Sequence, residues 1–155
     1  MKQHSKSGFV PILVPLSLSP DLEINDSLSI CEFLAESYPE LSLWPQDGQL
    51  RAVARSAAAE MHSGFGEIRN TYHTNFVAKY EGVIHVTEQA EKEIDRLLAL
   101  WDQARKMTIA RLDVLGEKDE GFLFGRFSVA DSFFWPVLWV GFPLLSLILR
   151  YLTLK

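Results

Sequence analysis

The pattern of apolar and polar residues changes about a third of the way along the chain. Residues 9–16 are apolar and β-branched, and Leu22 to Ile24 form a second short run after a turn-like segment, so both are predicted as strands. Apolar residues then recur at helical spacing from about Asp26 to Ser37, and Pro39 ends this predicted helix. Two prolines and a glycine follow in residues 38–48, which indicates a connection, and we assign residues 41–48 as the linker.

Beyond the linker the period is helical throughout. One apolar stripe marks a first long helix, and its members are Leu50, Val53, Ala54, Ala57, Ala58, Met61, Phe65, Ile68, Tyr72 and Phe76. A second long helix is predicted at about 87–115 with Gly116 at its end, and a capping box, Ser128-x-x-Asp131, predicts a third. The expected fold is therefore a small α/β unit of two strands and one helix (residues 1–40), a helical bundle (49–139) and an apolar tail (140–155).

Composition narrows the class of protein. The 155 residues are 48% apolar and 23% charged, as in a globular domain. The net charge is −5 and Lys and Arg do not cluster, which argues against nucleic acid as a partner. The single cysteine, Cys31, excludes an intrachain disulfide, and the polar N-terminus has no apolar stretch of the signal-peptide kind, so the expected location is the cytoplasm.

The C-terminal part raises the question of a membrane segment. Residues 132–149 contain no charged residue and reach the lower edge of a membrane-spanning length. Pro136 and Pro143 interrupt this stretch, however, and we favour a buried helix followed by an apolar tail. On this interpretation we do not expect a membrane partner.

Candidate chemistry concentrates where the second predicted strand meets the first helix. Asp26 and Ser27 stand at a helix start, where free backbone N–H groups and the helix dipole favour an anionic group. A carboxylate and a hydroxyl at this place could hold the ammonium and carboxylate of a small zwitterion. Taken alone, the pair is more simply explained as an N-cap.

Other chemically capable residues are interpreted as structural. No metal-binding spacing of His and Cys occurs, so no metal site is expected. Cys31 lies on the apolar side of its helix and is interpreted as a small core residue. His62 is interpreted as a polar residue at a helix or dimer boundary.

Five motifs, in order along the chain, resemble those of the glutathione transferase superfamily, and in particular its bacterial and fungal members of the serine type. The residues that carry the resemblance are Val10-Pro11, Asp26-Ser27, the junction from Tyr38-Pro39-Glu40 through Trp44-Pro45 to Arg51-Ala52, the segment Ala59 to Phe65, and Phe127 to Asp131. The resemblance implies a partial thioredoxin-like first domain followed by the all-α domain of this family. In this context the binding interpretation of Asp26 and Ser27 is preferred over a simple N-cap.

The resemblance also implies a role for particular residues. The Val10-Pro11 peptide bond would be cis, and the backbone of Val10 would meet the cysteinyl part of glutathione. Asp26 and Ser27 would bind its γ-glutamyl end. The candidates for an electrophile pocket lie on the first long helix and are Phe65, Arg69 and Tyr72. The capping box of Ser128 and Asp131 would have a structural role.

The implied reaction is attack of the glutathione thiolate on a small hydrophobic electrophile, or a thiol-dependent isomerisation, with glutathione as substrate and no further cofactor. In the family the Ser, Tyr or Cys that stabilises the thiolate lies in a β-α-β unit before the Val-Pro strand. Only nine residues precede Val10 here, so no catalytic residue is assigned and the chain resembles a member truncated at both ends. The alternative is a non-catalytic fragment of this family, with weak glutathione binding or a protein-interaction role. A homodimer is a candidate assembly, because relatives are usually dimers.

Overall fold

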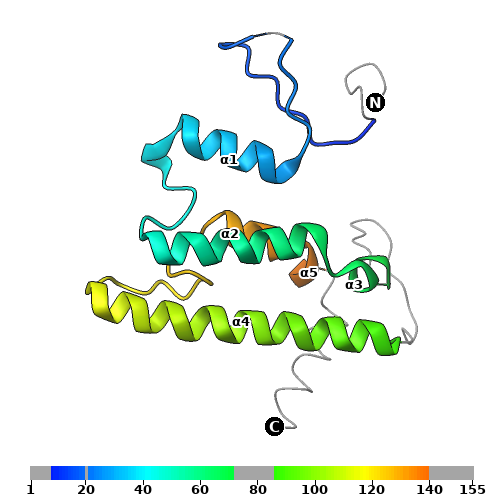
Figure 1. The fold of residues 1–155 in the computed structure, drawn as a ribbon, viewed down its shortest axis with the longest axis vertical. Coiled ribbons are helices and arrows are strands. Elements are labelled where there is room, and N and C mark those ends of the chain that lie inside the picture. Colours follow the sequence, from blue (N-terminus) through cyan, green and yellow to red (C-terminus); the bar gives the residue numbers. More distant parts are fainter. Residues whose placement is uncertain (1–7, 20, 72–85, 140–155) are drawn as a thin grey trace.

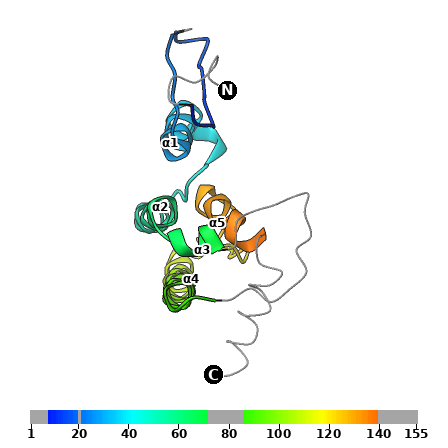
Figure 2. The same ribbon diagram turned by 90° about the vertical axis from the view of Figure 1, so that its right-hand side faces the viewer.

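The computed structural model describes residues 8–19, 21–71 and 86–139. Its helices are α1 (Ser27–Ser37), the short 3-10 helix η1 (Pro39–Leu41), α2 (Gly48–Ser63), α3 (Gly66–Thr71), α4 (Glu88–Leu115) and α5 (Val129–Trp139). Helices α1, α2 and α4 are stacked with roughly parallel axes, and α5 lies beside α2 (Figures 1 and 2). Successive members of this stack run in opposite directions, so the start of α1 lies near the end of α2 (Figure 1).

The N-terminal segment contains less sheet than expected. Leu13 and Ile24 exchange backbone hydrogen bonds of 2.8 and 2.9 Å in an isolated antiparallel bridge. No strand is assigned in the described residues, so the expectation of two strands is met only at this bridge. An isolated pair of short segments has little to stabilise an extended ladder. The Val10-Pro11 peptide bond is cis, as the resemblance implied.

Helix α1 begins one residue later than predicted. Asp26 is its N-cap, and the Asp26 carboxylate accepts a hydrogen bond of 2.9 Å from the backbone N–H of Ser29. Leu28, Cys31 and Ala35 pack against the hydrophobic core while remaining half-buried. Cys31 thus takes the place of a small core residue, in agreement with its interpretation from the sequence.

The prediction of one long helix across residues 50–76 is wrong in one respect, because α2 ends at Ser63. A Cβ atom at Gly64 would lie 2.8 Å from the backbone oxygen of Glu60, so this sharp exit needs glycine. Phe65 follows with a positive φ of 55°, and α3 then starts anew. The Glu93 carboxylate, from α4, accepts the backbone N–H groups of Glu67 and Ile68 at 3.3 and 2.9 Å. Tyr72 and Phe76 lie outside the described residues.

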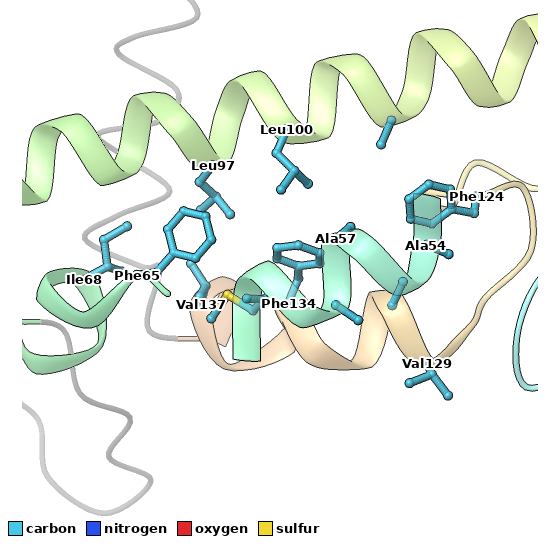
Figure 3. Packing of buried hydrophobic residues seen from close by; sticks show 14 of the residues in the cluster. Ala54, Ala57, Phe65, Ile68, Leu97, Leu100, Phe124, Val129, Phe134 and Val137 are labelled. Atoms are coloured by element: carbon cyan, nitrogen blue, oxygen red, sulfur yellow. The ribbon is translucent and has the colours of Figure 1, made fainter. Parts of the chain in front are cut away.

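The core lies where α2, α4 and α5 meet (Figure 3). Ala54, Ala57 and Ala58 on α2 are buried in this core. Phe134 of α5 is 1% exposed and meets the ring of Trp101 of α4 edge to face, with 5.7 Å between centroids. Most of the predicted apolar stripe is therefore confirmed as core; the buried members of α2 to α4 include Leu50, Met61, Phe65, Ile68, Ile94, Leu97, Leu100, Ala104 and Leu112.

Both ends of α4 agree with the prediction. Thr87 caps the start, and Gly116 closes the end in the left-handed conformation with φ of 66°. Thr108 is a buried polar residue that the apolar pattern did not indicate. Its hydroxyl donates a hydrogen bond of 2.9 Å to the backbone oxygen of Leu123, so α4 is joined to the loop before α5.

Ser128 and Asp131, the pair of the predicted capping box, are hydrogen-bonded at the start of α5. The backbone N–H and the hydroxyl of Ser128 donate to Asp131 Oδ2 at 2.9 and 3.1 Å. The other carboxylate oxygen of Asp131 accepts the backbone N–H of Leu123 at 3.0 Å. Asp131 therefore fixes the preceding loop as well as the helix start.

Within residues 8–19, 21–71 and 86–139, no helix is both long and apolar enough to cross a membrane. Helix α5 runs through Pro136, which is exposed. The apolar tail at residues 140–155 lies outside the described residues.

Candidate functional site

The start of α1 places an acidic side chain between two partners. Asp26 Oδ1 accepts the Ser29 N–H, and Asp26 Oδ2 lies 2.8 Å from Nε2 of His62. An ionised carboxylate can only accept, so the shared proton resides on His62 Nε2. In the Asp26-Ser27 pair, Asp26 is the N-cap, and Ser27 is the first residue of the helix. Ser27 is half-buried.

These partners keep Asp26 charged. The Ser29 N–H foremost, and the His62 ring in addition, lower the pKa of the Asp26 carboxyl, which is therefore ionised at neutral pH. The Asp26 side chain is 44% exposed. Since each carboxylate oxygen can accept more than one hydrogen bond, Asp26 can still receive a cationic ligand group from solvent.

His62 connects four helices at this site. It lies in the last turn of α2, and its ring stands edge-on to Phe133 of α5 with 5.8 Å between centroids. Arg69 of α3 donates to the backbone oxygen of His62 at 3.2 Å. The sequence placed His62 at a boundary but did not reveal its contact with Asp26, because the two residues are 36 positions apart and no local pattern links them.

The Leu13–Ile24 bridge fixes how the N-terminal segment faces α1. Because the pair is antiparallel, the chain before Leu13, with Val10 and Pro11, and the chain after Ile24, with Asp26 and Ser27, leave the bridge on the same side. The residues predicted to bind the cysteinyl and γ-glutamyl parts of glutathione thus come to the same end of the bridge. Val10 is 65% exposed there.

The candidate electrophile-pocket residues are divided. Phe65 is 6% exposed and belongs to the core, whereas Arg69 is exposed next to His62. Tyr72 lies outside the described residues. The structure therefore places Arg69 against the backbone of His62 and the Phe65 side chain in the core.

Other reactive groups in the described part of the chain do not add a second centre. Burial raises the pKa of the Cys31 thiol, with smaller contributions from Glu32 and Asp26, so this thiol is protonated at neutral pH. No group of His, Cys, Asp and Glu side chains suited to a metal ion occurs among the described residues.

Comparison with known proteins gives a partial likeness. Over 75 residues, 48% of this chain, the sequence is 37% identical to Glutathione S-transferase 1 of Dianthus caryophyllus. This stretch makes up 32% of that relative, so the match spans about a third of the relative's length. No protein-family model matches the chain, and no solved structure matches it. The chain is thus similar to a glutathione S-transferase over about half of its own length.

Proposed function

We propose that the chain is a protein of the glutathione transferase family that binds the γ-glutamyl end of glutathione at the start of α1. The observation that carries the proposal is the ionised, solvent-accessible carboxylate of Asp26 at the start of α1, which Ser29 and His62 hold beside Ser27. The likeness to a glutathione S-transferase supports the same assignment.

The γ-glutamyl and cysteinyl parts of the ligand have matching groups. The α-ammonium of the γ-glutamyl residue would bond Asp26, whose carboxylate is held in place by Ser29 and His62. The α-carboxylate would meet the Ser27 hydroxyl and the free N–H groups at the start of α1. The backbone of Val10 would pair with the cysteinyl residue as a strand pairs with its neighbour.

Binding and catalysis are separate proposals. In the proposed reaction, a glutathione thiolate attacks a small hydrophobic electrophile or serves a thiol-dependent isomerisation, and glutathione is consumed as substrate or regenerated. We assign no residue of this chain to thiolate stabilisation, and the half-buried Cys31 side chain packs against the hydrophobic core. This observation favours a second candidate, a non-catalytic glutathione binder that acts through protein contacts.

The remaining parts of the proposal follow from the same resemblance. They comprise a partial thioredoxin-like unit at 1–40, a linker at 41–48, an all-α domain at 49–139, a cytoplasmic location and a homodimer. Size-exclusion chromatography with light scattering would test the dimer directly.

Calorimetric titration with ligand fragments tests the binding site. Glutathione and γ-glutamylcysteine should bind, whereas cysteinylglycine, which lacks the γ-glutamyl end, should not. Asp26→Asn keeps an oxygen that can cap α1 but removes the charge, and we expect an affinity loss of about tenfold or more from one charge-assisted hydrogen bond.

Matched variants control for changes in charge and hydroxyl content. Asp21→Asn removes an exposed carboxylate before the helix, and Ser37→Ala removes an exposed hydroxyl at its far end, as a match for Ser27→Ala. The proposal is wrong if glutathione does not bind the natural chain, or if Asp26→Asn binds it as well as Asp21→Asn does. Turnover of a chlorodinitrobenzene electrophile by a chain that binds glutathione would favour the enzyme, and its absence the non-catalytic binder.

A further inference from the structure

The contact between His62 and Asp26 places a group that can change its charge beside the candidate ligand site. The start of α1 lies near the end of α2 (Figure 1), and His62 Nε2 lies 2.8 Å from Asp26 Oδ2. The two side chains are 36% and 44% exposed, so solvent protons reach the ring and a ligand reaches the carboxylate. Histidine is the side chain whose charge ordinarily changes between about pH 5 and 8. In the same interval Asp26 remains ionised, because its pKa is lowered.

The hydrogen bond between the two residues is compatible with both charge states of His62. A neutral ring donates its Nε2 proton to the carboxylate, and a protonated ring donates the same proton and also becomes a counter-ion. The difference lies in the charge that a ligand meets. Asp26 beside a neutral His62 presents an uncompensated negative charge, whereas Asp26 beside a protonated His62 is part of a neutral pair.

The other groups packed around His62 include a cation. Arg69 of α3 donates to the backbone oxygen of His62 at 3.2 Å, and its guanidinium has the same sign of charge as an imidazolium. The neighbour from α5 is the uncharged ring of Phe133, and residues 58–59, one turn earlier in α2, are alanines. Asp26 is thus the anion that compensates a protonated His62. A ligand cation at Asp26 would compete with His62 for this carboxylate.

We propose that His62 controls, through its own charge, whether Asp26 can hold the ammonium group of a ligand. This inference rests on the proposed function, because the ammonium in question is that of the γ-glutamyl residue. A neutral His62 leaves the negative charge of Asp26 to the ligand, and a protonated His62 takes it. The site thus binds its zwitterionic ligand at neutral pH and releases it in mild acid.

The expected size of the effect follows from the shared carboxylate. Since the imidazolium and the ammonium would bond the same group, they would stand about 5 Å apart. Two like charges at this distance weaken binding about fourfold in the dielectric of water, and by more where solvent is partly excluded. A purely structural role of His62 predicts the opposite direction. In that case the protonated ring would hold α1 more tightly against α2 and would favour a ligand at the first turn of α1.

Calorimetric titration with S-methylglutathione at about pH 5.5 and about pH 7.5 measures the effect. The methyl group removes the titration of the thiol, and the remaining charges of this probe change little in the interval. The natural chain should bind it at least about threefold more weakly at the lower pH. His62→Gln keeps a side-chain N–H that can donate to Asp26 but cannot be protonated, so its affinity should be the same at both pH values.

Arg55→Gln is the matched control for a loosened attachment of α1. It removes the ion pair between Arg55 of α2 and Glu32 of α1 and leaves the Asp26–His62 contact in place. Arg55→Gln should therefore retain the pH dependence of the natural chain, whatever its affinity at neutral pH.

A measurement without ligand tests the charge change separately. The signal of the Asp26 carboxyl carbon in ¹³C NMR spectra should shift between about pH 5.5 and about pH 7.5, because the charge of the adjacent ring changes while Asp26 stays ionised. This shift should be absent from His62→Gln. Should His62→Gln not fold, the carbon signal and the direction of the pH dependence in the natural chain decide.

The inference is wrong if the affinity of the natural chain is unchanged or rises in acid, or if His62→Gln loses affinity in acid as the natural chain does. It is also wrong if Arg55→Gln lacks the pH dependence, or if the Asp26 carbon signal does not shift. Failure of S-methylglutathione to bind at either pH would instead reject the proposed function, and the carbon signal would then decide this inference alone.

Discussion

The carboxylate of Asp131 should be among the most important single polar groups for stability in this fold. It accepts the backbone N–H groups of Leu123 and Ser128 and the Ser128 hydroxyl, and so joins the loop after α4 to the first turn of α5. Ser128 is 5% exposed and Leu123 is half-buried, so water can replace these bonds only in part. Asp131→Ala removes the acceptor and leaves both backbone donors unmet.

The expected cost follows from those two donors. A hydrogen bond to a charged group contributes about 1.5–3 kcal/mol, and taking the lower figure for each backbone donor gives about 3 kcal/mol for Asp131→Ala. We omit the Ser128 hydroxyl, because it can rotate toward another acceptor. For a chain of this length, a loss of about 3 kcal/mol lowers the melting temperature by about 6–12 °C. Asp131→Asn keeps one acceptor oxygen but turns an NH₂ group toward the other donor, so its cost should be smaller, about 2 kcal/mol.

Urea unfolding followed by circular dichroism at the helix band measures this free energy. Asp95→Ala and Asp95→Asn are the controls, since Asp95 is an exposed carboxylate in the middle of α4, and each should change stability by less than about 0.5 kcal/mol. The reasoning fails if Asp131→Ala costs less than about 1 kcal/mol, or no more than Asp95→Ala.

Three further predictions use other parts of the structure. The hydrogen bond from Arg111 and the backbone N–H groups at the start of α2 lower the pKa of Asp47 to about 2, below the value near 4 in an unfolded chain. The stabilisation from the Asp47 carboxylate is therefore present above about pH 4 and is lost as the pH falls toward 2. The melting temperatures of the natural chain and Asp47→Asn should converge in acid, and a constant difference would contradict this. Ala58→Leu should cost about 1–3 kcal/mol in urea unfolding, because Ala58 of α2 is fully buried in the core. Leu at the exposed neighbour Ala59 should be tolerated, and equal costs would exclude tight packing as the cause. Glu93→Gln should speed amide hydrogen exchange at Ile68, the backbone donor that the Glu93 carboxylate accepts at 2.9 Å, and unchanged exchange would show that this carboxylate does not hold α3.

Features that depend on residues close together in the sequence were predictable. The stripe through Ala54, Ala58 and Met61 has helical spacing, and these residues are buried. Gly116 and the Ser128–Asp131 pair were recognised because a cap depends on residues only a few positions apart. The same local signals identified the start of α1 as the place of the candidate site.

Features that depend on distant partners were not predictable. The apolar stripe continues through Gly64, but α3 starts anew where the Glu93 carboxylate of α4 accepts the Ile68 N–H, 25 positions away. The contact of His62 with Asp26 joins residues 36 positions apart. The two predicted strands fail for a related reason, because an apolar segment becomes a strand only when neighbouring segments complete its hydrogen bonds.

The way α1 is attached has a consequence for the energetics of ligand binding. None of residues 27–37, all of which the structure describes, is fully buried, and two polar contacts tie this helix region to α2: the Asp26–His62 hydrogen bond and the Glu32–Arg55 ion pair. Both contacts are partly exposed, and salt screens the Glu32–Arg55 ion pair. Helix α1 can thus open as a local unit while α2, α4 and α5 stay folded. Any ligand held at the first turn of α1 would have to shift this equilibrium toward the closed state. Raising the ionic strength should therefore weaken the ligand's apparent affinity before it lowers the stability of the bundle.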